Sequence, residues 1–162
     1  MPRIRNPYAG KPGFRCFGCS PDNPLGLHME FSLEGDTVVS TWSPQAHLQG
    51  YSGVLHGGIQ ATLMDEIASW AIQVMGRSSG VTSELTVRYL KPVPVDHGPL
   101  RLEARLVETR HHLTTVGVTL RGDDGTPLSE ATVRYFVYPP EVAARKLDYP
   151  GADAFLASEP AS

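Results

Sequence analysis

Two short segments in the middle of the chain carry residues that could perform chemistry. The first is His56-Gly57-Gly58, which opens a stretch with a helical pattern. Glycines at a helix start leave backbone N–H groups uncovered, and the helix dipole there favours negative charge. Such a site could hold a developing oxyanion or a phosphate. The plainer alternative is that the glycines only permit a tight turn into the helix, and the glycines alone do not separate the two.

The second segment is the acidic pair Asp65-Glu66, about two helical turns further along. Asp65 lies at the edge of the polar arc, where its helical neighbours Ala61 and Ala68 are apolar. A partly desolvated carboxylate in that position is suited to activating water. Glu66 lies nearer the middle of the arc and fits a solvated surface acid better. Each acid, taken alone, also fits an ordinary solvated helix face.

The elements that must position these residues follow from the spacing of apolar side chains. Residues 56–76 predict one long helix, and because it is apolar over most of its circumference it should be buried on most sides. Strand patterns precede and follow it, with a hairpin signal at Asp124-Gly125. The predicted strands cover about residues 27–33, 38–42, 84–89, 100–106, 113–120 and 131–137.

Consecutive strands joined by short connections favour an antiparallel sheet. The predicted fold is α+β, with a curved antiparallel sheet wrapped around one long central helix. The proline- and glycine-rich residues 1–26 predict an irregular N-terminal arm. We expect the domain over residues 27–140 and a C-terminal tail over 141–162, with a short helix near 141–146.

Length and composition narrow the function classes. The 162 residues predict one domain that can bury an ordinary core. The net charge of −3 gives no global attraction to nucleic acid. The N-terminal residues lack the apolar run of a secretory signal, and no stretch approaches the ~20 apolar residues that span a bilayer. We therefore expect a cytoplasmic protein with neither nucleic-acid nor membrane partners.

The only two cysteines, Cys16 and Cys19, have the spacing of half a zinc site. The sequence holds no second CxxC and no HxxxH-type pair to complete it, and His28 is only a weak candidate for a third ligand. A redox CxxC normally opens a helix after a strand, whereas this one lies in the arm. The sequence favours two reduced thiols that pack the arm against the body, with no metal site.

The run from His56 to Glu66, with its acid at position 65, resembles the HGG…D signature of PaaI-like hotdog-fold thioesterases, a family of acyl-CoA thioesterases. Val81-Thr82, the segment 89–92 and the arm segment 23–27 are also similar to that family. The resemblance covers about residues 16–138. It implies the hotdog fold, which agrees with the element order above.

The resemblance also implies roles for single residues. Asp65 would be the general base or the nucleophile, and the Gly57 amide would polarise the thioester carbonyl. His56 would help to hold that carbonyl or stabilise its loop. Thr82 matches a position that often orients the nucleophilic water, although an ordinary strand threonine is an equally good interpretation.

Substrate contacts are expected from Gly58, Gln49 and Glu66. Many relatives carry Asn or Gln six residues before the histidine, where this chain has Gly50. The adjacent Gln49 could take over that role.

The function that this implies is hydrolysis of an acyl-CoA or similar acyl thioester to a free acid and a thiol, with no metal or redox cofactor. A hotdog dehydratase and a non-catalytic acyl-CoA-binding or sensor protein are the alternatives. Gly57 and Asp65 lie about 12 Å apart along one helix, at ~1.5 Å per residue. A site shared between two chains meets the catalytic geometry more easily, so we expect a homodimer or a homotetramer built as a dimer of dimers.

Overall fold

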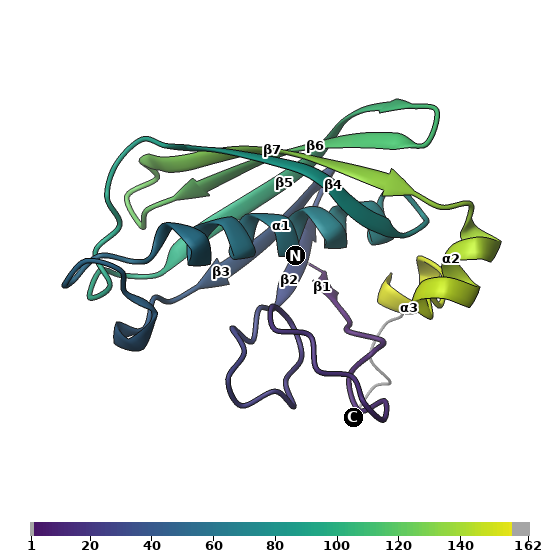
Figure 1. Ribbon diagram of the computed structural model, residues 1–162, viewed down its shortest axis with the longest axis horizontal. Coiled ribbons are helices and arrows are strands. Elements are labelled where there is room, and N and C mark those ends of the chain that lie inside the picture. Colours follow the sequence, from purple (N-terminus) through teal and green to yellow (C-terminus); the bar gives the residue numbers. More distant parts are fainter. Residues whose placement is uncertain (1, 157–162) are drawn as a thin grey trace.

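The computed structural model describes residues 2–156, which form a seven-stranded sheet, one long helix and two short C-terminal helices (Figure 1). All neighbouring strands pair antiparallel, in the order β1-β2-β3-β5-β6-β7-β4. The strands are β1 (Arg3–Ile4), β2 (Phe31–Glu34), β3 (Thr37–Trp42), β4 (Gly80–Tyr89), β5 (Leu100–Arg110), β6 (Leu113–Arg121) and β7 (Pro127–Val137). The helices are α1 (Gly57–Val74), α2 (Pro140–Leu147) and α3 (Asp153–Leu156), with a 3-10 turn η1 at Ala46–Leu48.

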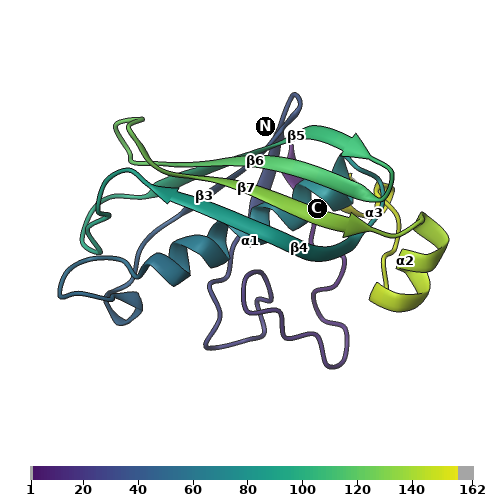
Figure 2. The same ribbon diagram turned by 45° about the horizontal axis from the view of Figure 1, so that its top comes forward.

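Helix α1 lies between two layers. The sheet curves over one side of it, and the N-terminal arm with α2 and α3 lies on the other (Figures 1 and 2). Trp70 contacts both layers, since its ring stacks on Phe31 of β2 at 4.4 Å and meets the edge of Phe155 of α3 at 5.3 Å. Each large apolar side chain buried in this way contributes roughly 1.5–3 kcal/mol. The broad apolar arc of α1 is therefore covered within one chain.

The predicted fold, a curved antiparallel sheet around one long helix, is confirmed, and so is the short helix after the last strand. The strand predicted over 27–33 is wrong in its first half, because β2 begins only at Phe31. The backbone N–H groups of Leu27 and Met29 donate instead to Phe17 and Gly18 of the arm. The arm also adds the short strand β1 to the sheet. The last six residues of the expected tail, 157–162, lie outside the described residues.

Strand β4 forms one edge of the sheet. It pairs with β7 along its whole length, and no other described strand pairs with its outer edge. The register shifts between Thr82 and Glu84, a bulge of the kind found at sheet edges and next to active sites. Val81 and Tyr89 are exposed on this strand. Such an edge presents unpaired backbone groups to a second strand.

No helix within residues 2–156 has the length and apolarity needed to span a membrane.

Candidate active site

Asp65 lies in the second half of the expected catalytic segment, and two hydroxyl groups hold its side chain. Thr82 of β4 donates a hydrogen bond of 2.8 Å to Asp65 Oδ1. Tyr135 of β7 donates to the same oxygen and to the Asp65 backbone carbonyl, each at 2.7 Å. These bonds fix the carboxylate on α1 against two neighbouring strands. The second carboxylate oxygen forms no hydrogen bond within residues 2–156, so it is free to accept a proton from water.

Tyr135 was missed by the sequence interpretation, although a signal for it exists. It occupies an inward-facing position of β7, where Ala131 and Val133 are apolar, and a polar side chain in such a set needs a partner. Burial raises the pKa of the Tyr135 hydroxyl far above its usual value, and the negative charge of Asp65 raises it further. The hydroxyl therefore stays protonated and donates throughout the neutral range.

The N-terminus of α1 carries the second half of the site. His56 is the N-cap residue, and its Nδ1 accepts a 2.8 Å bond from the Gly58 N–H. This bond leaves the proton of a neutral imidazole on Nε2, the outer ring nitrogen. The N–H groups of Ile59 and Gln60 donate to the His56 carbonyl. Within residues 2–156 the Gly57 N–H has no partner, so it is the free donor of the first turn.

A cavity of about 640 Å³ opens at this helix end. Tyr89 lines it, and its hydroxyl donates 2.7 Å to the Gly57 carbonyl, which ties the edge strand to the helix start. The cavity wall is formed by Gly50, Tyr51, Val54, Leu55, His56, Gly57, Gln60, Tyr89, Leu90, Lys91 and Pro92. The wall is mostly apolar, with the His56 and Gly57 donors at one point, which suits an acyl or pantetheine chain ending in a polar carbonyl.

Position 50 adjoins the cap histidine, as the resemblance implies. A Cβ added at Gly50 would lie 3.2 Å from His56 Cδ2, so a longer side chain there would contact the ring. Gln49 does not occupy that space in the same way, because its Oε1 accepts a 2.7 Å bond from the Gly53 N–H. The side chain of Gln49 is used to hold its own loop.

Glu66 lies apart from the other expected site residues. Its Oε1 accepts from the Cys16 thiol at 3.4 Å and from Trp70 Nε1 at 3.1 Å. The carboxylate therefore faces the arm, away from Thr82 and Tyr135, and we leave it out of the reaction proposed below. The Gly58 N–H, engaged by His56, is also unavailable to a substrate.

The two halves of the site do not meet within one chain. Asp65 is not among the residues that line the cavity at the helix start. Along α1 the two positions are separated by about 12 Å. The Asp65 cluster instead lies beneath the open edge strand, since Thr82 belongs to β4.

The hotdog fold seen here is shared with solved thioesterases. A family model described as thioesterase superfamily matches residues 52–129. A solved protein of that superfamily superimposes with a TM-score of 0.70 at 26% identity, covering 75% of this chain and 62% of that one. A hypothetical thioesterase from Streptococcus pneumoniae, solved with coenzyme A, gives a TM-score of 0.64 at 26% identity over 69% of this chain and 90% of that one.

Curated sequences point to the same family. A Saccharolobus solfataricus protein that carries the provisional name of an esterase is 29% identical over 72% of this chain and 76% of its own length. The mouse acyl-coenzyme A thioesterase THEM4 is 27% identical over 72% of this chain, which spans about half (51%) of the mouse enzyme. The chain is thus similar to members of the thioesterase superfamily in sequence and in fold.

Proposed function

We propose that the protein hydrolyses an acyl-CoA thioester to a free acid and CoA, as a member of the PaaI-like group of hotdog thioesterases. The observation that carries this proposal is the Asp65 carboxylate, held by two hydroxyl groups with one oxygen left free. The free Gly57 N–H at a helix start supplies the complementary oxyanion donor. The solved relative with coenzyme A supports CoA as the thiol carrier.

In the proposed reaction Asp65 acts as a general base. Its free oxygen takes a proton from a water molecule, and the water oxygen forms a bond to the thioester carbonyl carbon. The Gly57 N–H and His56 Nε2–H stabilise the oxyanion. The C–S bond then breaks, and the thiolate leaves and takes up the proton from Asp65 or solvent. Direct attack by the same carboxylate oxygen, followed by hydrolysis of the anhydride, would use the same residues.

The separation of Asp65 from Gly57 leads us to propose that each site is shared between two chains. A second copy paired along the open edge of β4 would continue the sheet and cover its unpaired backbone groups. It would also bring another helix start toward the Asp65 cluster, because Thr82 and Tyr89 both lie on this strand. A homodimer, or a tetramer made of two such dimers, would hold complete sites.

The proposal is tested by turnover on a panel of short, medium and aromatic acyl-CoA substrates, with release of free thiol as the readout. We expect saturable thiol release for at least one acyl class. Double-bond hydration or dehydration without thiol release would identify a dehydratase. Binding of acyl-CoA without any turnover would identify a sensor, and either outcome would overturn the proposed hydrolysis.

A further inference from the structure

Three metal-binding side chains converge where the N-terminal arm meets α1. The Sγ atoms of Cys16 and Cys19 and a carboxylate oxygen of Glu66 all lie within 4.8 Å of one another. The Cys16 Sγ and Glu66 Oε1 atoms are 3.4 Å apart. Cys19 is buried and Cys16 and Glu66 are half-buried, so the cluster is sheltered but can be reached by water.

The backbone of the arm is shaped to hold these three groups together. The Ser20 N–H donates a 3.0 Å hydrogen bond to the Cys16 carbonyl, which closes the turn that holds both cysteines. The Met29 N–H donates to the Gly18 carbonyl at 2.9 Å. A Cβ added at Gly18 would lie 2.5 Å from the Glu66 carboxyl carbon. The glycine therefore lies directly against the Glu66 carboxylate, in the middle of the Cys16–Cys19 turn.

The two thiols and the carboxylate of this cluster can all carry negative charge, and no cationic side chain described here is paired with Glu66. Glu66 takes part in none of the ion pairs formed among residues 2–156. Its partners are two neutral donors, the Cys16 thiol and the Trp70 indole. Partly buried carboxylates are usually paired with a cation or bind a metal ion. Two thiols beside such a carboxylate are the soft ligands that select zinc among the common divalent ions.

We propose that Cys16, Cys19 and Glu66 bind one zinc ion, with a water molecule as the fourth ligand. Zinc–sulfur distances of about 2.3 Å and zinc–oxygen distances of about 2.0–2.2 Å place tetrahedral ligand atoms roughly 3.5–3.8 Å apart, close to the spacing of the cluster. Binding displaces the thiol protons of both cysteines into solvent. His28 is not among the metal-binding side chains that lie within 4.8 Å of one another here.

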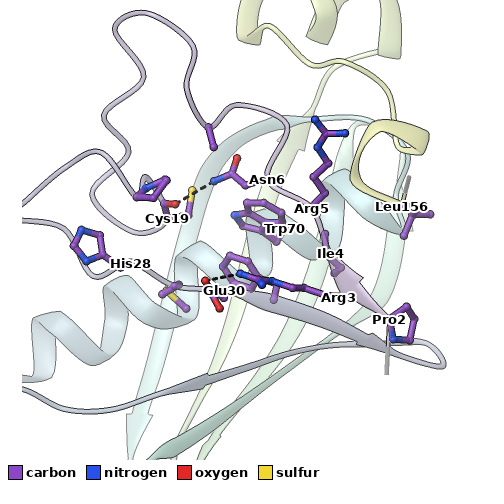
Figure 3. A pocket seen from close by; sticks show the side chains of 14 residues that line it. Pro2, Arg3, Ile4, Arg5, Asn6, Cys19, His28, Glu30, Trp70 and Leu156 are labelled. Atoms are coloured by element: carbon purple, nitrogen blue, oxygen red, sulfur yellow. Dashed lines mark hydrogen bonds and ion pairs between the residues drawn. The ribbon is translucent and has the colours of Figure 1, made fainter. Parts of the chain in front are cut away.

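Such an ion would fasten the arm to the helix that carries the catalytic aspartate. Figure 3 shows Cys19 beside Trp70 in the cavity of about 720 Å³ between the arm and α1, with His28 at another part of the wall. Glu66 directly follows Asp65 on α1. The ion has an anchoring role, and the hydrolysis proposed above does not pass through it.

The site is tested on the full chain by metal analysis, independently of any activity. The wild-type protein is equilibrated in a zinc buffer that holds free zinc at low nanomolar concentration, and bound zinc is measured by mass spectrometry. We expect about one zinc per chain. Replacement by Co²⁺ should produce a thiolate-to-cobalt charge-transfer band together with the strong visible bands of a tetrahedral ion.

The variants assign the ligands. The double variant Cys16→Ser/Cys19→Ser should lose both the zinc and the charge-transfer band. Glu66→Gln should bind zinc more weakly, whereas Glu141→Gln, which changes an exposed acid of α2, should bind as the wild type does. If the double variant fails to fold, the cobalt spectrum of the wild type still tests for thiolate ligands, and zinc binding by Glu66→Gln still tests the carboxylate ligand. A wild-type protein without zinc, zinc without the charge-transfer band, or zinc retained by a folded double variant would overturn the proposal.

Discussion

Asp65 and Glu66 are neighbours on α1, yet their surroundings give them different chemistry. The Asp65 carboxylate receives hydroxyl groups from two strands of the sheet and keeps one oxygen free. The Glu66 carboxylate receives a thiol and an indole from the arm side of the helix. The helix turns its acids toward opposite layers of the molecule, so that one can serve the reaction and the other can anchor the arm.

Replacing Asp65 with asparagine should abolish most of the activity while preserving the fold. The amide has the size of the carboxylate but cannot accept a proton from water, so kcat should fall at least ~10²-fold. The measurement is steady-state thiol release, with circular dichroism as the check on folding. Asp96→Asn, which changes an exposed acid away from the site, is the matched control. Near wild-type turnover by Asp65→Asn would remove this residue from the mechanism.

Tyr135→Phe tests whether the Tyr135 hydroxyl positions the Asp65 carboxylate for the reaction. It removes a hydroxyl that donates to the Asp65 carboxylate, a charge-assisted bond whose loss costs about 1.5–3 kcal/mol, so kcat should fall about tenfold or more. Because this hydroxyl positions the carboxylate and does not contact the substrate, the loss should fall on kcat and leave KM nearly unchanged.

The matched control for this change is Tyr149→Phe, which removes another buried tyrosine hydroxyl. That hydroxyl donates to the Gln73 carbonyl, far along α1 from Asp65. It should lower stability without lowering kcat. An unchanged kcat for folded Tyr135→Phe would leave this tyrosine with a purely structural role.

The family resemblance allowed prediction of the site residues in the helix motif and of Thr82 in the next strand, whereas Tyr135, on a strand more distant in the sequence, was missed. Asp65 and Thr82 were assigned together through the family resemblance, and their side chains touch. Tyr135 lies 70 residues from Asp65, and only the order of strands β7 and β4 places it there. Cys16 and Glu66 are separated by 50 residues, so the spacing rules for metal sites could not link them.

At the level of the elements, α1 is fastened at its C-terminal end as well as at its catalytic end. The Tyr8 hydroxyl of the arm donates 2.6 Å to Gln73 Oε1, and the Tyr149 hydroxyl donates 2.7 Å to the Gln73 carbonyl. Burial raises the pKa of Tyr149 to about 12 and that of Tyr8 further still. Both contacts therefore require protonated tyrosines.

This arrangement predicts a loss of stability at alkaline pH. Above pH ~10 the unfolded chain releases its tyrosine protons, while the folded chain keeps those of Tyr8, Tyr135 and Tyr149. The unfolded state then binds fewer protons, so the free energy of unfolding falls as pH rises, by up to ~1.4 kcal/mol per pH unit for each group.

Urea unfolding at pH values from about 9 to 11 measures that slope. Tyr149→Phe should reduce it, and Tyr51→Phe, at a position where the side chain is 87% exposed, should leave it unchanged. The same slope in wild type and Tyr149→Phe would show that this tyrosine titrates alike in both states.

Element types were predicted more reliably than element partners. The long helix was predicted over 56–76 and observed over Gly57–Val74, because its apolar arc, its opening glycines and Gly76 all agree. Residues 27–30 also have an apolar alternation, but they bond to the arm turn at Phe17 and Gly18. Alternation records which side chains are buried, and it does not show which backbone supplies the hydrogen bonds.

For the molecule as a whole, the structure offers two features that favour a dimer and one that does not. The apolar arc of α1 does not call for a partner, because the sheet and α3 of the same chain already cover it, as Trp70 between Phe31 of β2 and Phe155 of α3 shows. The features that favour a dimer are the open edge of β4 and the separation of Asp65 from Gly57 within one chain. Thr82 and Tyr89, on that one strand, contact the Asp65 cluster and the Gly57 helix start respectively. A partner strand along β4 would therefore lie next to both halves.

Mixed dimers test whether one site draws Gly57 from one chain and Asp65 from the other. Gly57→Pro removes the free N–H, and proline is tolerated at the first helical position. A Cβ there would lie 3.3 Å from the Tyr89 ring, so Gly57→Ala, which adds the Cβ but keeps the N–H, is the matched control. Homodimers of Gly57→Pro and of Asp65→Asn should each be nearly inactive, whereas Gly57→Ala should retain most activity.

When differently tagged Gly57→Pro and Asp65→Asn chains are mixed and the mixed dimers purified, a shared site predicts recovery. One site of each mixed dimer then carries both defects, while the other combines an intact Gly57 with an intact Asp65. About half of the wild-type activity per dimer should return, because one of two sites is complete. If each chain held its own site, both sites of the mixed dimer would carry one defect and no activity would return. Folded mixed dimers as inactive as both parents would therefore place Gly57 and Asp65 of one site in the same chain, and they would leave the β4 edge without a catalytic role.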